Sequence, residues 1–151
     1  MTESILFVCL GNICRSPTAE AVTRALAERE GLDLLLDSAG TGSWHVGEPP
    51  CPGMVQAAAE SGYDLTALRA RQLTGGDFTR FDLIVAMDRA NLDDIAGVTP
   101  KGARAEVKLF TEFAPETGLR DVPDAYFTRD YVGALRLIET CAKGLVASLK
   151  R

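Results

Sequence analysis

The segment 5–17 of this 151-residue chain reads Ile5-Leu6-Phe7-Val8-Cys9-Leu10-Gly11-Asn12-Ile13-Cys14-Arg15-Ser16-Pro17. It begins with four consecutive apolar residues, a pattern typical of a parallel strand that is covered on both faces. Ser16 and Pro17 then open a helical pattern that ends at Gly31, since proline is tolerated in the first turn of a helix and glycine commonly follows its end. The segment therefore predicts a strand over Ser4–Cys9, a short loop and a helix, which together begin a parallel βαβ unit.

The remainder of the chain repeats this alternation of strands and helices. Further strands are expected at 34–36, ending in the segment 37–40, at 82–87 and at 106–110, with helices at 52–61 and 88–95, a short turn or helix at 75–81, and loops at 41–50 and 111–127. Asp88 is the expected cap of the helix that follows it. The clearest helix is 128–149, where apolar residues recur at gaps of three and four and form a stripe that must face a core: Tyr131, Leu135, Ile138, Ala142, Leu145 and Leu149.

This alternation predicts a doubly wound α/β fold. The sequence shows no linker, repeat or low-complexity tract, so we expect a single domain over residues 1–151. The expected core is a four-stranded parallel sheet with helices on both faces and the flavodoxin-like strand order 2-1-3-4. In such sheets ligands bind outside the carboxyl ends of the strands, and Cys9 lies at that end of the first strand.

Composition argues against several classes of function. The net charge is −5 and the sequence has no block of Lys or Arg, which argues against nucleic acid as a partner. No apolar stretch approaches the roughly 18 residues of a membrane span, and Met1–Ser4 lacks the basic region of a signal peptide. None of the four cysteines belongs to a C-x-x-C pair, so neither a zinc site nor a disulfide scaffold is expected. We expect a cytoplasmic protein without a membrane partner, while secretion without a signal peptide stays open.

The loop after the first strand suits the binding and attack of a phosphate. A cysteine and an arginine stand six positions apart, with a glycine between them and a helix start behind them. Backbone amides of such a loop can turn inward, and the helix N-terminus adds partial positive charge. Arg15 supplies a planar fork of donors that fits two oxyanions at once, and the same field favours a thiolate at Cys9. Cys9 and Arg15 are therefore the first candidates for catalysis.

The stretch Cys9–Pro17 resembles the signature loop of the low-molecular-weight protein tyrosine phosphatases. A bare C-x5-R pattern occurs by chance, but the longer loop together with a late Asp-x-Tyr is much more specific. Further blocks look like those of the same family, in the same order along nearly the whole chain: Ser38–Thr41, Trp44–Gly47, Ala70–Gln72, Phe81–Asp82, Met87–Asp88, Asn91–Leu92 and Val122–Tyr126.

The resemblance implies a cysteine-dependent phosphomonoester hydrolase. It would be a protein tyrosine phosphatase that hydrolyses phosphotyrosine, and small aryl phosphates, through a cysteinyl-phosphate intermediate. It would need no cofactor and no metal. Its partner would be a protein that carries phosphotyrosine, its product would be inorganic phosphate, and we expect the chain to act as a monomer.

The residues of the loop take their expected roles from the resemblance and from their chemistry. Cys9 would attack phosphorus, and Arg15 would hold two phosphoryl oxygens. Gly11 and Asn12 suit a loop that needs positive φ, and Ser16 is expected to donate to the Cys9 sulfur, to cap the helix, or both. The phosphate-binding set is completed by the other residues of the loop: Leu10, Ile13 and Cys14.

A carboxylate before the last helix is the expected general acid, because protonation helps a phenolate to leave. Asp124 is favoured over Asp121, since it stands directly before Ala125-Tyr126, where the resembled family has Asp-Pro-Tyr. Ala125 in place of that proline should loosen the segment without removing the carboxylate.

Aromatic residues are candidates for the walls of a slot that admits a flat phenyl ring: Trp44, Tyr126 and Phe127. Packing in the core is the alternative for Trp44 and Phe127. His45, the only histidine, is given no catalytic role because the mechanism needs none. The family usually has a histidine where Leu68 stands, which supports the loop asparagine, so Asn12 is expected to find a different partner.

The resemblance also suggests a role for Cys14, which lies five residues from Cys9. In the family a cysteine at this place can form a reversible disulfide with the nucleophile and shield it from irreversible oxidation. We expect the same pairing here, with a small buried residue as the alternative. Cys51 and Cys141 are interpreted as structural.

Other functions remain open at this point. A protein-arginine phosphatase on the same fold resembles this loop but has threonine in place of Ile13, whose branched apolar side chain favours an aromatic ring. A thiol-dependent arsenate reductase needs further cysteines near the third strand, and 82–95 contains none. A non-catalytic phosphate or phosphopeptide sensor has no use for Cys9, Arg15 and Asp124 together.

Overall fold

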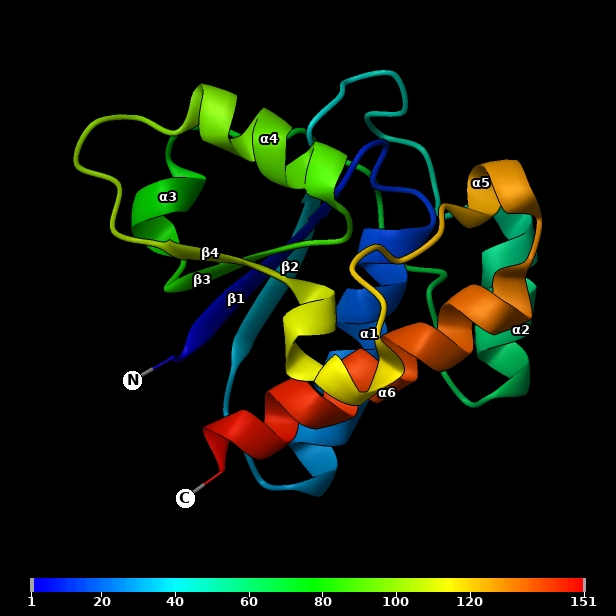
Figure 1. Ribbon diagram of the computed structural model, residues 1–151. Helices are drawn as coiled ribbons and strands as arrows, with labels where there is room; N and C mark the ends of the chain where they lie inside the picture. The colour runs from blue at the N-terminus through cyan, green and yellow to red at the C-terminus, as the bar shows by residue number, and fades with distance from the viewer. Residues whose placement is uncertain (1, 151) are drawn as a thin grey trace.

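The protein is built on a four-stranded parallel sheet, shown in Figure 1 as a computed structural model that describes residues 2–150. Every neighbouring pair of strands is parallel. The expected fold class and strand order are therefore confirmed, while Met1 and Arg151, the two ends of the expected domain, lie outside the described residues. The strands, in the spatial order β2-β1-β3-β4, are β1 (Ser4–Cys9), β2 (Leu35–Gly40), β3 (Leu83–Ala86) and β4 (Glu106–Leu109).

Helices connect these strands, and none of the described helices is long and apolar enough to cross a membrane. The first four α-helices occupy segments where the sequence predicts them, and Asp88 caps α4 as expected, its side chain accepting from the Asn91 amide. The helices are α1 (Arg15–Arg29), α2 (Pro52–Glu60), α3 (Asp77–Arg80), α4 (Arg89–Val98), the 3₁₀ helices η1 (Phe110–Phe113) and η2 (Pro115–Thr117), α5 (Ala125–Thr128) and α6 (Tyr131–Leu149).

The apolar run of β1 explains why both faces of the sheet are covered. Ile5 and Phe7 belong to the larger core cluster, to which α1, α2 and α6 contribute. Leu6 and Val8 alternate to the other face, into a smaller cluster with residues of α3 and α4. All of these β1 side chains are fully buried. In Figure 1, α1 and α6 accordingly lie on one side of the sheet, and α3 and α4 on the other.

The second strand is longer than its apolar residues indicate. It continues through Asp37 and Ser38, because the register with β1 holds as far as Cys9 opposite Gly40. The polar side chains within it have partners: Asp37 forms an ion pair with Arg71, and Ser38 takes part in a buried hydrogen-bond network. Tertiary partners therefore carry the strand through a polar stretch.

The prediction of a continuous loop over 111–127 followed by a helix from Thr128 is wrong. The helices η1 and η2 occupy its first part, and α5 precedes α6. α5 begins because the side chain of Asp124 accepts from the Tyr126 amide. It ends at Arg129, whose φ of 62° is left-handed. The segment before the last helix therefore contains short helices in place of a continuous loop.

The buried stripe of α6 has the expected side chains. Asp130 caps this helix, with Oδ1 accepting from the Gly133 amide at 2.9 Å. Phe110, expected at the end of β4, opens η1 instead and packs its ring against Phe7 with centroids 5.5 Å apart. The stripe is fully buried at its centre and partly buried at its ends: Leu135, Ile138, Ala142 and Leu145, then Tyr131 and Leu149.

The loop after β1 lies at the carboxyl end of the sheet. From β1 the chain passes through α1 to β2 on one side, and later crosses to β3 on the other, so this loop lies at a topological switch point. Gly40, the last residue of β2, comes so close to the loop that a Cβ there would lie 2.8 Å from the Leu10 carbonyl oxygen. A side chain at this position would displace the loop.

Candidate active site

The loop of residues 10–14 curls around the sulfur of Cys9. The amide of Asn12 donates to Cys9 Sγ at 3.3 Å, and Ser16 Oγ lies 3.0 Å from the same sulfur. Cys9 is only 3% exposed. Cys14 occupies the N-cap position of α1 without a side-chain capping bond. Ser16 therefore contacts the sulfur and does not cap the helix.

Positive φ in this loop falls on Asn12, at 58°, and not on Gly11. Asparagine is one of the few residues besides glycine that adopt this conformation readily. Gly11 is needed for a different reason, because a Cβ there would lie 3.0 Å from His45 Cδ2. Asn12 thus has the expected conformation, whereas Gly11 supplies space.

The side chain of Asn12 ties the loop to two other segments. Its Oδ1 accepts from the Arg71 amide at 2.9 Å, and its Nδ2 donates to the hydroxyls of Ser16 at 2.7 Å and Ser38 at 3.0 Å. These partners serve Asn12 in a chain that has Leu68 in place of the histidine implied by the resemblance.

The buried carboxylate of Glu20 extends this hydrogen-bond network beyond Ser38. Ser38 Oγ donates to Glu20 Oε1 at 2.8 Å, and Glu20 Oε2 accepts from Arg24 at 2.9 Å. Burial raises the pKa of Glu20 above its usual value, while the bonds from Arg24 and Ser38 act against that shift. Sequence reasoning missed Glu20, because no local pattern shows that α1 and β2 bring it to Ser38.

The loop holds hydrogen-bond donors for which the described residues offer no acceptor. They are the backbone amides of Gly11, Ile13 and Cys14. Nε of Arg15 is also buried without a partner. Ile13, Cys14 and Arg15 are buried residues, and unpaired donors on buried residues are rare unless a ligand or water takes their hydrogen bonds. Together with the positive end of α1 they form a site for an anion beside Cys9.

Arg15 is held at this site by three acceptors. Nη1 donates to Asp88 Oδ2 at 2.5 Å and to the Val122 carbonyl at 3.0 Å, and Nη2 donates to Asp124 Oδ2 at 3.3 Å. Burial alone would lower the pKa of Arg15, but the negative charges of Cys9, Asp88 and Asp124 outweigh it and raise the pKa above its usual value. Sequence reasoning found Asp88 as a helix cap and missed its contact with Arg15.

Beside the loop the surface opens into a cavity of about 380 Å³. The aromatic residues expected to form a slot meet there, and the core alternative is wrong for Trp44 and Phe127, which are each 70% exposed. The cavity is lined by Cys9, Leu10, Gly11, Ile13, Cys14, Trp44, His45, Asp124, Tyr126 and Phe127.

His45 also belongs to this wall, although the sequence assigned it no role. Its ring centroid lies 5.9 Å from that of Tyr126, and its Nδ1 is 3.1 Å from Glu48 Oε2. Across residues 2–150, no group of three or more His, Cys, Asp or Glu side chains is placed to hold a metal ion. His45 is therefore a wall residue of the cavity rather than part of a metal cluster.

The family model described as low molecular weight phosphotyrosine protein phosphatase matches residues 4–151. The chain belongs to this family. One relative, the low molecular weight protein-tyrosine-phosphatase YfkJ of Bacillus subtilis, is 39% identical over 150 residues, which cover 98% of this chain and 96% of the relative. The low molecular weight phosphotyrosine protein phosphatase of Schizosaccharomyces pombe is 48% identical over 132 residues, or 84% of each chain.

Solved structures of similar proteins agree with this assignment to the low molecular weight phosphatases. The crystal structure of YfkJ has a TM-score of 0.93 at 38% identity and covers 99% of this chain and 95% of that one. The crystal structure of DARP, the drosophila arginine phosphatase, has a TM-score of 0.89 at 30% identity and covers 100% of this chain and 99% of that one. The family and fold expected from the resemblance are therefore confirmed.

In this low molecular weight phosphatase, Asp124 and not Asp121 faces the loop. Asp124 lines the cavity, approaches Arg15 and accepts from the Tyr126 amide at 3.1 Å. Asp121 is engaged elsewhere, since it accepts from the Arg89 amide at 2.9 Å and from Arg89 Nη2 at 3.1 Å. The two carboxylates, three positions apart in sequence, thus have different partners: Asp124 pairs with Arg15 at the loop, and Asp121 pairs with Arg89.

Ala125 departs from the proline that the family motif places after the acidic residue. It is fully buried as the first residue of α5. Asp124 before it has φ of −83° and ψ of 104°, an extended conformation of the kind that a following proline would also favour. The cap on Tyr126 and the burial of Ala125 hold this segment, while the expected loosening remains a prediction.

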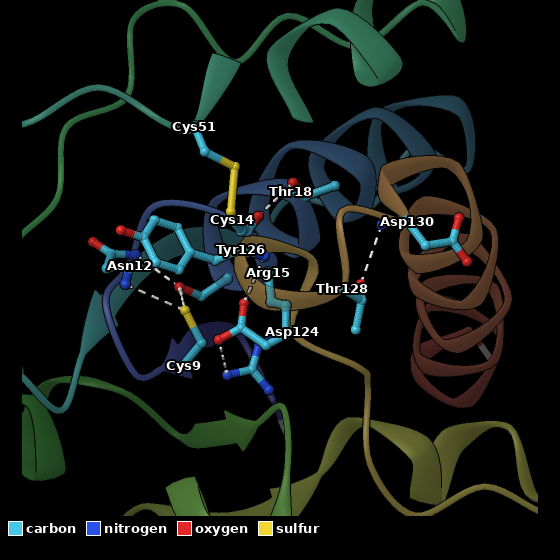
Figure 2. The surroundings of a disulfide bond; sticks show 11 residues. Cys9, Asn12, Cys14, Arg15, Thr18, Cys51, Asp124, Tyr126, Thr128 and Asp130 are labelled. Carbon is cyan, nitrogen blue, oxygen red and sulfur yellow. Dashed lines mark hydrogen bonds and ion pairs between the residues drawn. A yellow bond between two sulfur atoms is a disulfide. The ribbon is translucent and has the colours of Figure 1, made fainter. Parts of the chain in front are cut away.

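The cysteine pairing of this phosphatase differs from the expected one. Cys14 forms a disulfide with Cys51, 37 residues later (Figure 2). Cys9 and Cys141 are free and buried. The pairing follows from the start of α2 lying beside the loop, with the two Cα atoms 5.6 Å apart. The resemblance implied Cys9 as the partner of Cys14, and nothing in the sequence shows that the fold brings Cys51 beside it.

Proposed function

We propose that this chain is a protein tyrosine phosphatase that hydrolyses phosphotyrosine and small aryl phosphates through a cysteinyl-phosphate at Cys9. The observation that carries the proposal is the set of unpaired donors around the sulfur, namely the amides of Gly11, Ile13 and Cys14 and Nε of Arg15. A phosphoryl group offers oxygens that accept from all of them. The substrate is a protein that carries phosphotyrosine, the product is inorganic phosphate, and the thiol chemistry needs no metal or cofactor.

In the first step Cys9 Sγ attacks phosphorus in line with the leaving phenolate oxygen. Arg15 holds two of the remaining oxygens and offsets their charge in the transition state. Ser16, 3.0 Å from the sulfur, donates to the thiolate and eases its departure when the intermediate is hydrolysed. Leu10 and Asn12 complete the loop, and the Asn12 amide also donates to the sulfur.

Asp124 is the proposed general acid. Its carboxyl group gives a proton to the leaving phenolate, whose conjugate acid has a pKa of about 10. The resulting carboxylate then accepts a proton from the water that attacks the phosphocysteine, which releases phosphate and free Cys9. The place of Asp124 in the cavity wall supports this role, and the ion pair of Asp121 with Arg89 argues against its rival.

The cavity wall supports an aryl substrate. Trp44, Tyr126 and Phe127 gather around an opening that leads to Cys9. A phenyl ring carries its phosphate to the sulfur between such walls, whereas the shorter phosphoserine side chain does not reach it. Ile13, which lines the same cavity, adds an apolar surface that suits a ring better than a guanidinium.

Initial rates of para-nitrophenyl phosphate hydrolysis between about pH 4 and pH 8 test the proposal. We expect an active wild type, an inactive Cys9→Ser, and a loss of roughly 10²–10⁴-fold for Asp124→Ala. Asp121→Ala is the matched control and should keep most of the rate. An inactive wild type, or a rate indifferent to Cys9, would reject the proposal in favour of a phosphate sensor.

The arginine phosphatase alternative is not favoured, although one similar structure is that of an arginine phosphatase. Rates on matched phosphotyrosine and phosphoarginine peptides decide between them. We expect the wild type to prefer phosphotyrosine and Ile13→Thr to shift the ratio toward phosphoarginine. A wild type that prefers phosphoarginine would overturn the assignment of substrate while leaving the thiol mechanism in place.

A further inference from the structure

A disulfide joins the loop to a helix that takes no part in the proposed hydrolysis. Cys14 is the N-cap residue of α1, and Cys51 is the N-cap residue of α2. Their sulfurs are bonded, while the Cys9 sulfur has no disulfide partner (Figure 2). The oxidised pair in this protein therefore leaves the proposed nucleophile free.

Both members of the pair lie at the N-terminus of a helix. The N-terminus of an α-helix carries partial positive charge that stabilises a cysteine thiolate, and α1 and α2 contain 15 and 9 residues. Cys14 and Cys51 are buried as well, at 2% and 7% exposed, but each lies at a helix N-terminus, whereas Cys141 lies inside α6, where burial raises its pKa to about 12. Cys14 and Cys51 are thus suited to thiol–disulfide exchange, and Cys141 is not.

Cys14 lies between Cys9 and Cys51. Cys9 and Cys14 both line the cavity, so both border the space in which a peroxide would oxidise Cys9. A backbone hydrogen bond also holds Cys51 beside the loop, since its amide donates to the Ile13 carbonyl at 2.8 Å. The reduced Cys14 sulfur would reach Cys9 by rotation about the Cα–Cβ bond, which turns it from Cys51 toward the cavity that both residues line.

We infer that Cys14 and Cys51 form a two-thiol relay that reduces Cys9 after a peroxide has oxidised it, with the Cys14–Cys51 disulfide as the end product. The inference rests on the proposed function, because it takes Cys9 as the reactive thiolate of the cavity. It gives the protein a further activity, the stoichiometric reduction of a peroxide at the expense of two thiols that are not its nucleophile.

The relay has three steps. Cys9 takes an oxygen atom from hydrogen peroxide and becomes a sulfenic acid, with release of water. The Cys14 thiolate attacks the Cys9 sulfur, which forms a Cys9–Cys14 disulfide and releases a second water. The Cys51 thiolate attacks the Cys14 sulfur, so that the Cys14–Cys51 bond forms and Cys9 leaves as a thiolate. The electrons and protons taken up by the peroxide come from Cys14 and Cys51, and Cys9 ends unchanged.

Fully reduced protein, freed of reductant and treated with equimolar hydrogen peroxide, tests the relay. Hydrolysis of para-nitrophenyl phosphate is followed over time without reductant, and disulfides are mapped by mass spectrometry. We expect the wild type to lose and then regain activity, with Cys14–Cys51 as its bridge. Cys51→Ser and Cys51→Ala should stop at Cys9–Cys14 and stay inactive until a thiol reductant is added. Cys141→Ala, which removes a thiol outside the relay, should behave as the wild type.

Two results would overturn the relay. One is recovery of the Cys51 variants at the wild-type rate. The other is formation of the Cys14–Cys51 bridge in Cys9→Ser as fast as in the wild type, since both thiols would then be oxidised directly. This second readout is a mass measurement and does not depend on hydrolysis, whereas the rates of untreated protein report on the proposed function alone. Serine is a favoured N-cap residue, so we expect the start of α2 to tolerate Cys51→Ser.

Discussion

Arg15 Nη1 donates a hydrogen bond of 2.5 Å to Asp88 Oδ2, which joins the first turn of α1 to the residue that caps α4. The two residues follow β1 and β3, which are neighbours in the sheet. The guanidinium is therefore ordered by the fold before an anion arrives. Such preorganisation lowers the entropic cost of binding the anion.

Replacing Asp88 by serine is expected to lower kcat while largely preserving Tm. Serine caps a helix about as well as aspartate, so α4 keeps its cap, but the hydroxyl is too short to reach Arg15. We expect kcat for para-nitrophenyl phosphate to fall roughly 10²-fold, as for an ångström-scale misplacement. Asp93→Ser, a change of an exposed acid on the same helix, should leave kcat and Tm unchanged. A normal kcat in Asp88→Ser would mean that Val122 and Asp124 alone position Arg15.

Arg15→Lys separates charge from geometry. Both side chains are cations across the working pH range, and the negative charges of Cys9, Asp88 and Asp124 raise the pKa of Arg15 further. Lysine lacks the planar fork, so we expect kcat to fall roughly 10²–10³-fold, as when a transition-state donor is removed. Inhibition by inorganic phosphate should weaken as well. Arg89→Lys, at an exposed ion pair, is the control, and an unchanged kcat in Arg15→Lys would contradict bidentate binding.

Two substitutions at Asn12 separate its backbone from its side chain. Both Asn12→Gly and Asn12→Ala remove the hydrogen bonds to Arg71, Ser16 and Ser38 and should lower kcat alike. Only alanine must also adopt the left-handed φ of 58°. The strain of alanine at this φ exceeds the conformational entropy that glycine loses on folding. The free energy of unfolding of Asn12→Gly should therefore be about 0.5–1 kcal/mol larger than that of Asn12→Ala. Urea unfolding measures the difference, and a more stable alanine variant would argue against this backbone conformation.

Trp44→Ala should affect the binding of aryl substrates but not of phosphate. The indole is 70% exposed at the cavity mouth, so its loss disturbs little of the core. We expect KM for para-nitrophenyl phosphate to rise about 2- to 10-fold, which corresponds to the roughly 0.5–1.5 kcal/mol of an aromatic pair. The inhibition constant of inorganic phosphate should stay constant. An equal rise in both constants would show that Trp44 shapes the loop instead of the wall.

Asp77 should make the protein sensitive to acid. Burial acts to raise its pKa, but hydrogen bonds from Arg71 and the Thr74 amide outweigh it and place the pKa below the usual 3.8. The unfolded chain therefore binds this proton at higher pH, so the contribution of Asp77 is fully present above pH 3.8 and is lost as the pH falls through the lower folded value.

Asp77→Asn should consequently be less stable than the wild type at neutral pH. The gap in the free energy of unfolding should narrow as the pH falls below 3.8 and through the lower pKa of folded Asp77, where the wild-type carboxylate takes up its proton. Urea unfolding over this range measures the gap, with Asp93→Asn as an exposed control. A gap that stays constant would mean that the carboxylate of Asp77 is not titrating in this window.

The first strand and the loop were predictable because their signals are local. The apolar run before Cys9 indicates a strand covered on both faces, and Pro17 marks the helix start. The stripe of α6 is equally local, since its period is set within one helix. The blocks that resemble the phosphatase family placed Asp124 near the loop, and the Asp-x-Tyr pattern within them ranked it above Asp121.

The parts that escaped prediction depend on tertiary partners. The contact between Asp88 and Arg15 depends on β3 lying beside β1, and the support of Ser38 by Glu20 depends on α1 lying beside β2. The Cys14–Cys51 bond requires α2 to lie beside the loop, which sequence spacing does not reveal. In each case the partner is a residue distant in the chain.

The loop around Cys9 takes its shape from segments that are far apart in sequence. Asn12 bonds to Arg71 and Arg15 to Asp88 and Val122, at separations of 59, 73 and 107 residues. Contacts of such high sequence separation form late, and parallel strands with long crossovers fold slowly. A refolding chain should regain its circular dichroism before it regains turnover. Recovery of turnover is thus a stricter measure of complete folding than any signal from secondary structure.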